Sequence, residues 1–180
     1  MHDKRSLIIE TATRMIRHGG YNAFSFREIA DRIGIKSSSV HHYFRRKEDL
    51  AVAVAKRYSE DFFDALGPPG APEADSANKL RHYCDTFIKS FNTSGNACLC
   101  GILSHESPAL PTTVVHEIAQ FVDDNIRWLD AALESGGSPG KNTRSPMLIY
   151  CALEGAMALA TLKNNVSCLQ KVKNRILEQA

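Results

Sequence analysis

Two short helical segments separated by a glycine occupy residues 24–50, whose sequence is FSFREIADRIGIKSSSVHHYFRRKEDL. Ser25 and Glu28 form an S-x-x-E capping box, which marks the start of the first segment. Gly34 provides the turn, because a positive φ costs little only for glycine. Two helices joined in this way are typical of a helix-turn-helix that reads DNA.

The residues of this window separate onto an apolar and a polar side. The second segment begins at Lys36 or Ser37, of which the serine is chemically the better cap. The apolar side consists of Ile29, Ile33, Ile35, Val40 and Phe44. Hydroxyl, phenol and cationic groups on the other side suit phosphate oxygens and guanine. We expect DNA contacts from Arg27, Lys36, Ser37, Ser38, Ser39, His41, His42, Tyr43 and Lys47.

Two alternatives apply to this window. It could form an αα-hairpin within a helical bundle that has no role in DNA binding. The adjacent pair His41-His42 could also suggest a metal site, but neighbouring residues on a helix point about 100° apart. We therefore expect no metal there.

The charge distribution favours a nucleic-acid-binding N-terminal region. Residues 1–50 carry ten Lys and Arg against six Asp and Glu, a balance of +4, whereas residues 51–180 have a balance of −2. The charged segment Met1–Glu10 does not resemble a signal peptide, and no apolar stretch approaches the ~20 residues that span a bilayer. Five cysteines without framework spacing favour reduced thiols. We expect a cytoplasmic protein without a membrane segment.

Helical periodicity continues through the rest of the chain, and no stretch alternates like a strand. In the helix expected over 112–134, we expect Val115, Ile118, Ala119, Val122, Ile126 and Leu129 to face inward. The other helices are expected over residues 7–18, 47–66, 77–91, 146–163 and 166–178, with a short segment at 97–107. The sequence predicts an all-α fold, with a three-helix DNA-binding domain over residues 1–46 and a C-terminal domain over 47–180.

The stretch FREIADRIGIKSSSVHHYFRRKEDL resembles the helix-turn-helix and the start of the fourth helix of the TetR (tetracycline-repressor-like) family of transcriptional regulators. The resemblance covers about residues 4–57 and includes the pair Tyr43-Phe44. It implies that Ser39, His42, Tyr43 and Lys47 contact phosphates, and that Arg27 and Lys36–Ser38 lie at the groove. The chain departs from the family at Lys36, where Ser is frequent, near Ser38, where Gly or Pro is frequent, and at His41, where Tyr is frequent.

The resemblance also implies a homodimer that pairs through its last two helices and binds a palindromic operator. The sequence supports pairing independently, because residues 146–163 are apolar on most sides and need covering on more than one face. The alternative is the central helix of a monomeric core. The expected interface residues are Leu148, Ala152, Gly155, Ala156, Leu159, Leu169, Val172 and Ile176.

TetR-like regulators usually hold a small-molecule effector in the C-terminal domain, and its binding separates the DNA-binding regions. Apolar and aromatic side chains could line such a pocket, although ordinary core packing accounts for most of them. We expect two or three to touch the effector. The candidates are Phe62, Tyr83, Phe87, Phe91, Cys98, Cys100, Phe121 and Trp128.

The Cys98-Leu99-Cys100 sequence allows several interpretations. Cys98 is expected at the start of a short helix, whose dipole favours a thiolate, and some family members with Cys-Leu at this junction respond to electrophiles or oxidants. Free cysteine also packs as a small hydrophobic residue. A soft-metal site would combine Cys98 and Cys100 with His105 and His116, but C-x-C lacks the second ligand pair of a zinc motif.

These patterns predict a homodimeric repressor that a small-molecule effector releases from double-stranded DNA, with no cofactor and no metal. A thiol-based redox or electrophile sensor acting through Cys98 and Cys100 is the alternative. An enzyme using either cysteine with His105 has little support, because the chain has no P-loop, G-x-G-x-x-G or H-E-x-x-H motif. A helical adaptor without DNA affinity is the third interpretation.

Overall fold

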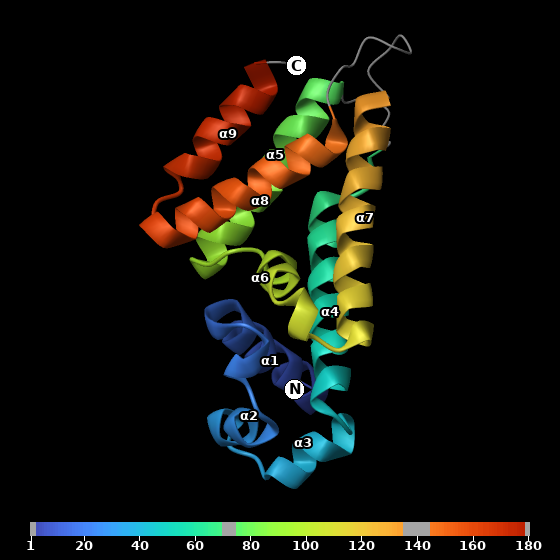
Figure 1. Cartoon of the computed structure of the whole chain (residues 1–180), viewed down its shortest axis with the longest axis vertical. Coiled ribbons are helices and arrows are strands. Elements are labelled where there is room, and N and C mark those ends of the chain that lie inside the picture. The colour runs from blue at the N-terminus through green and yellow to red at the C-terminus, as the bar shows by residue number, and fades with distance from the viewer. Residues whose placement is uncertain (1–2, 70–74, 135–144, 179–180) are drawn as a thin grey trace. The chain divides into compact units, whose positions relative to one another are not determined.

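The computed structural model describes residues 3–69, 75–134 and 145–178. Every regular element in these ranges is a helix (Figure 1), which confirms the predicted all-α fold. The elements, with η denoting a 3-10 helix, are α1 (Lys4–Gly19), η1 (Tyr21–Ala23), α2 (Phe26–Ile33), α3 (Ser37–Tyr43), α4 (Lys47–Leu66), α5 (Ser76–Ser94), α6 (Leu99–His105), η2 (Ser107–Ala109), α7 (Thr112–Glu134), α8 (Pro146–Lys163) and α9 (Ser167–Glu178).

The chain packs as two compact units, which are residues 1–60 with 99–120, and residues 61–98 with 121–180. This division differs from the functional boundary expected after residue 46, because α4 and α7 each contribute residues to both units. The functional boundary stays a prediction.

Most helix boundaries follow local signals in the sequence. Pro146 occupies the first turn of α8, where its missing N–H is harmless, and Gly67 follows α4 with a φ of +68°. The preferred cap of α3 was wrong. Lys36 is the N-cap residue and makes no side-chain cap bond, while Ser37 is already helical. The Lys36 carbonyl instead accepts a bond from the Ser39 backbone N–H at 2.8 Å.

In the first unit, α1 packs against α2 and α6. Asp3 caps the start of this helix, and its carboxylate accepts a bond from the Arg5 N–H. Its apolar face buries Ile8, Ala12 and Ile16 completely. This buried face is part of the hydrophobic core of the first unit.

The buried face of α7 differs from the expected one. Ala119 is exposed, and the side chains of Val115, Val122 and Ile126 are half-buried. Ile118 and Leu129 are buried as expected. The remaining buried positions of α7 are Val114, Phe121, Asn125, Trp128, Ala132 and Leu133. The helix is rotated from the predicted orientation because it buries its two large rings, which offer more apolar area than the valines.

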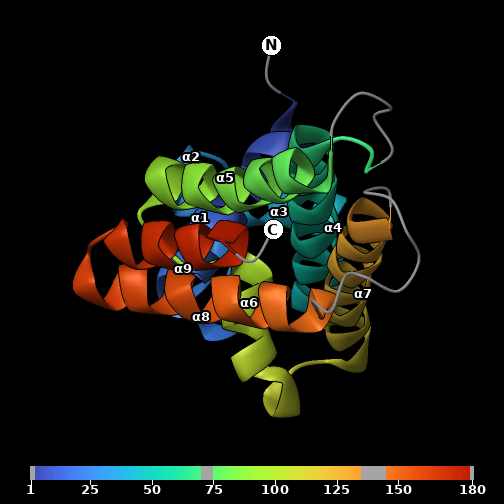
Figure 2. The ribbon, with the colours of Figure 1, turned by 90° about the horizontal axis from the view of Figure 1, so that it is seen from above.

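In the second unit, α9 lies against both α5 and α8 (Figure 2). Aromatic rings fill the interior of this unit. The Phe62 ring lies edge-on to Phe87 at a centroid distance of 5.5 Å and to Phe121 at 5.4 Å, and Tyr83 stacks on Trp128 at 5.4 Å. Edge-on and offset contacts of this kind are the preferred geometries of aromatic pairs.

A polar pair is enclosed in this aromatic interior. The Tyr83 hydroxyl donates to Asn125 Oδ1 at 2.7 Å, and Asn125 Nδ2 donates to the Phe121 carbonyl at 2.8 Å. Both side chains are fully buried. Burial, followed by the neighbouring Glu154 carboxylate, raises the pKa of Tyr83 well above its usual value of 10. The hydroxyl therefore stays protonated and acts as a donor.

We expect Tyr83→Phe to lower the free energy of unfolding by about 1–3 kcal/mol, because Asn125 Oδ1 loses its donor inside the core. Denaturant titration at one fixed protein concentration measures the loss. Tyr83→Phe combined with Asn125→Leu is the control and should cost less than the sum of the single changes, because the two residues interact. An unchanged midpoint in Tyr83→Phe contradicts the prediction.

α8 is the one described helix long and apolar enough to cross a membrane by length and composition, with a mean hydropathy of 1.2 over its 18 residues. No such stretch was expected from the sequence. α8 passes because it carries only two charged residues, Glu154 and Lys163, among mostly apolar ones. A third of this window is buried inside the protein. Because core helices pass the same test, this feature is weak support for a membrane span.

Candidate nucleic-acid interface

The start of α2 is held by the predicted capping box. Ser25 Oγ accepts a bond from the Glu28 N–H at 3.2 Å and donates to the Glu28 carboxylate at 2.7 Å. At the other end Gly34 adopts the left-handed conformation with φ +70°, and its N–H donates to the Ala30 carbonyl. The capping box and the glycine turn are both confirmed, so α2 and α3 form a helix-turn-helix.

The inner side of this motif is smaller than expected. Ile29 and Val40 are completely buried and Phe44 is 4% exposed, whereas Ile33 and Ile35 are half-buried. Part of the predicted apolar face therefore lies at the rim of the motif. Phe26, which the helical spacing places on the same face as Ile29, is buried as expected. Sequence reasoning did not place Phe24 in this core, although it is buried.

The outer side presents most of the predicted DNA-contact residues to solvent. Two histidine rings are supported by aromatic neighbours, because His41 lies edge-on to Phe26 at 4.7 Å and His42 to Tyr43 at 5.3 Å. Ser37 and Ser39 are half-buried. The exposed members are Arg27, Lys36, Ser38, His41, His42 and Tyr43. Their contacts with DNA stay a prediction.

Lys47 occupies a different environment from the other predicted contacts. Its Nζ lies 4.6 Å from the centroid of the Tyr21 ring and 4.7 Å from that of Phe24, which are cation–π contacts. Burial lowers the pKa of Lys47, and the carboxylates of Glu28 and Glu106 oppose this shift. The side chain is thus held by aromatic rings at the start of α4.

Arg46 has its charge partly neutralised by its own helix. Its backbone N–H donates to Asp49 Oδ2 at 2.9 Å, which caps the start of α4. Its guanidinium pairs with Glu48 at 2.6 Å and with Asp49 at 3.7 Å. Arg45 is exposed beside it. The basic run Arg45-Arg46-Lys47, which follows α3, therefore has less positive charge available for DNA than its sequence suggests.

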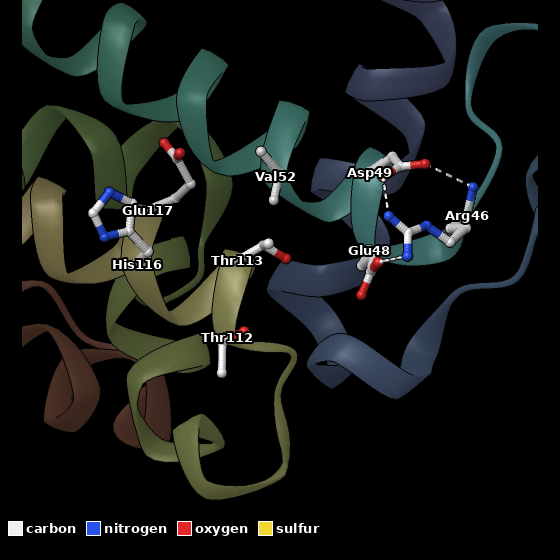
Figure 3. A pocket seen from close by; sticks show the side chains of 8 residues that line it. All are labelled: Arg46, Glu48, Asp49, Val52, Thr112, Thr113, His116 and Glu117. Carbon is white, nitrogen blue, oxygen red and sulfur yellow. Dashed lines mark hydrogen bonds and ion pairs between the residues drawn. The ribbon is translucent and has the colours of Figure 1, made fainter.

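A pocket of about 490 Å³ lies between the first turns of α4 and α7 in the first unit (Figure 3). Glu117 on its wall pairs with Lys56 at 3.4 Å, and Arg46 is paired as described above. The pocket is lined by Arg46, Glu48, Asp49, Val52, Thr112, Thr113, His116 and Glu117. None of these residues was predicted to bind an effector.

The predicted effector residues are buried in the protein. Four of the predicted rings, Phe62, Tyr83, Phe87 and Phe121, lie within one cluster of ring contacts, which Trp128 joins through Tyr83. Trp128 Nε1 also donates to the Gly67 carbonyl at 2.8 Å. The full set of buried candidates is Phe62, Tyr83, Phe87, Phe91, Cys98, Cys100, Phe121 and Trp128. Their contact with an effector stays a prediction.

The cysteines differ in exposure. Cys84, Cys98 and Cys100 are buried, Cys168 is half-buried and Cys151 is exposed. Burial raises the pKa of the Cys84 thiol to about 12. Cys98 precedes α6 as predicted, but it is 1% exposed. Burial at Cys98 and Cys100 favours packing over reaction with an electrophile, because reactive thiols are accessible.

The proposed soft-metal site is not assembled in the part of the chain that the structure describes. No three His, Cys, Asp or Glu side chains gather there in a way that could hold a metal ion. The structure therefore gives no support to a site made of Cys98, Cys100, His105 and His116.

One face of α8 is apolar and open to solvent. Leu148 is 71% exposed, Leu159 49% and Leu162 80%. With Ala152 and Gly155, which are also exposed, these positions recur every three or four residues and so lie on one side of the helix. Of the other predicted interface residues, Val172 is half-buried, and the structure buries Ala156, Leu169 and Ile176 within the protomer. These three belong to the core of the chain, so the fully exposed members of the predicted interface all lie on α8. The interface itself stays a prediction.

The comparisons with known proteins agree with this architecture. Residues 8–54 match the family described as "Bacterial regulatory proteins, tetR family". The HTH-type transcriptional repressor KstR2 of Rhodococcus jostii (strain RHA1) is 27% identical over 94 residues, which cover 52% of this chain and 46% of that protein. The chain thus matches about half the length of this relative.

Two further similarities extend over nearly the whole chain. The HTH-type transcriptional repressor NemR of Escherichia coli (strain K12) is 23% identical over 99% of this chain and 96% of that protein. A TetR transcriptional regulator from Legionella pneumophila has a solved structure that is 28% identical, with a TM-score of 0.89 over 99% of this chain and 97% of that chain.

The capped α2, the glycine turn and these relatives define a helix-turn-helix transcriptional regulator. Residues 8–54 belong to the TetR family of bacterial regulatory proteins, and the whole chain is similar to a solved TetR regulator.

Proposed function

We propose that this protein is a homodimeric repressor that binds a palindromic operator and leaves it when a small molecule binds the C-terminal domain. The exposed polar face of α3 is the observation that carries the proposal. Val40 and Phe44 are buried and anchor α3 in the core. Lys36, Ser38 and Tyr43 remain exposed, so they are accessible to a duplex. This is the geometry of a recognition helix in the major groove.

The apolar face of α8 supports the dimer. Large apolar patches that are open to solvent mark interaction surfaces, and a second copy of the same face is a self-complementary occupant under two-fold symmetry. Cys151 is exposed on this helix, so its thiol offers a cross-linking probe of the interface. Two joined recognition helices would read half-sites about 34–36 Å apart.

The aromatic interior of the second unit supports an apolar effector. The rings of Phe62, Tyr83 and Trp128 provide apolar surface, and the Tyr83–Asn125 pair provides a few fixed polar groups. Sites for small molecules combine these two features. The proposed location of such a regulator is the cytoplasm, and we infer no catalytic role for any residue.

Lys36→Ala tests the proposed DNA contact. We expect the variant to bind the preferred duplex about 1–3 kcal/mol more weakly, because a cation at the start of α3 contacts guanine or phosphate. The preferred duplex is first selected from a random pool with the wild-type protein, and affinities are then measured by fluorescence anisotropy.

Lys89→Ala is the matched control, since Lys89 is also exposed but lies on α5. It should bind like the wild type. Equal losses in both variants would mean that only overall charge matters. Failure of the wild type to select any sequence would reject the proposed function.

A further inference from the structure

The side chain of Glu106, at the end of α6, forms a hydrogen bond with the backbone of the helix-turn-helix region. It directly follows α6, and its Oε2 accepts a bond from the Tyr21 backbone N–H at 2.8 Å, across 85 positions of sequence. Tyr21 opens η1, the short helix between α1 and the capping residue Ser25. A carboxylate accepting a backbone N–H is a strong, charge-assisted hydrogen bond.

Gly20 allows this approach. A Cβ built on Gly20 would lie 1.7 Å from Glu106 Oε1, so any side chain there would collide with the carboxylate. Gly20 also has φ +76° and ψ −168°, a conformation open almost only to glycine. The chain thus keeps a residue without a side chain where the carboxylate meets the end of α1.

The Tyr21 ring contacts Lys47, the first residue of α4. It lies edge-on to Phe24 at a centroid distance of 5.9 Å, and Lys47 Nζ lies over both rings at 4.6 Å and 4.7 Å. Two successive contacts therefore run from Glu106 to the Tyr21 backbone N–H, and from the Tyr21 ring to Lys47, the first residue of α4. All of these residues belong to the first unit.

We propose that Glu106 is a positioning residue for operator binding, which fixes η1 from the end of α6 and thereby holds Lys47 where it can meet a DNA phosphate. The proposal rests on the proposed function and adds a route for its regulation, because a displacement of α6 would carry Glu106 with it. A carboxylate near Lys47 also opposes DNA directly by its charge. The positioning effect and the charge effect have opposite signs, which makes them separable.

Two substitutions separate these effects. Glu106→Gln keeps an oxygen that accepts the Tyr21 N–H bond but removes the charge, so we expect operator affinity equal to or above that of the wild type. Glu106→Ala removes both, and we expect affinity on the order of tenfold lower, because the hydrogen bond between a charged group and the Tyr21 backbone is absent. The slope of log affinity against log salt should also fall by about 0.9 for each phosphate that the variant no longer neutralises.

The experiment measures binding of the full-length protein to the duplex selected by the wild type, over a range of salt, for Glu106→Ala, Glu106→Gln, Lys47→Ala and Glu106→Ala with Lys47→Ala. If Glu106 acts through Lys47, the double variant binds no more weakly than Lys47→Ala alone. Thermal unfolding of each variant defines a temperature at which all are folded.

Equal gains in affinity for Glu106→Ala and Glu106→Gln would show a charge effect alone and overturn the inference. Additive losses in the double variant would overturn it as well, as would a loss in Glu106→Ala with an unchanged salt slope. If the wild type selects no duplex, the proposed function itself fails and the inference fails with it. Specific binding by the wild type that no Glu106 variant alters would overturn the inference alone.

Discussion

Leu159→Glu is expected to convert the protein into a monomer and to weaken operator binding by a factor on the order of 10²–10⁴, the usual gain from joining two binding modules. Leu159 is 49% exposed on the apolar face of α8. In the proposed dimer this face meets its own copy, so the substitution places two carboxylates in an apolar contact. Burying an unpaired charge is among the most costly changes at an interface. Light scattering measures the mass, and anisotropy measures the affinity.

Ala119→Glu is the matched control for this variant. Ala119 is exposed in the middle of α7, so the control adds the same carboxylate to a long helix outside the α8 face. It should remain a dimer and bind DNA like the wild type. A dimeric Leu159→Glu protein with wild-type affinity would show that the α8 face is not the interface.

Phe87→Ala is expected to lower the free energy of unfolding by about 3–5 kcal/mol, the usual cost of removing a buried ring. Phe87 is 1% exposed and lies 5.5 Å from Phe62, 5.3 Å from Tyr83 and 6.4 Å from Tyr150, measured between ring centroids. The surrounding rings come from several helices and collapse only partly around the gap. Denaturant unfolding followed by circular dichroism, at one protein concentration, measures the loss.

This result also separates the two interpretations of the aromatic residues. A ring that packs the core costs several kcal/mol to remove, whereas a ring that lines an empty pocket costs much less. Phe63→Ala is the comparison, because Phe63 is half-buried beside Phe62 and should lose clearly less stability. A loss below about 1 kcal/mol for Phe87→Ala, within the range of ordinary substitutions, would contradict the packing interpretation.

The parts of the fold that sequence reasoning predicted well depend on local chemistry. Ser25 and Glu28 are three residues apart and cap α2 through hydrogen bonds with each other. Gly34 forms its turn because of its own backbone freedom. Pro146 begins α8 for a similar reason. Such signals need no knowledge of the rest of the chain, and they were sufficient to place the helix-turn-helix.

The parts that sequence reasoning missed depend on distant contacts. The orientation of α7 was wrong because several faces of that helix are apolar, and only packing against Phe62 and Tyr83 selects the one with Phe121 and Trp128. The contact between Glu106 and Tyr21 joins residues far apart in the chain. No local pattern in the sequence predicts this contact, and none predicts the place of Lys47 beside the Tyr21 and Phe24 rings.

The most direct test of the account is the affinity of the wild-type protein for the duplex it selects, compared with a scrambled duplex of equal length at the same salt. The account predicts binding tighter by a factor on the order of 10³ or more, because in the proposed function the exposed face of α3 reads base edges as well as phosphates. Equal affinity for the two duplexes would contradict it.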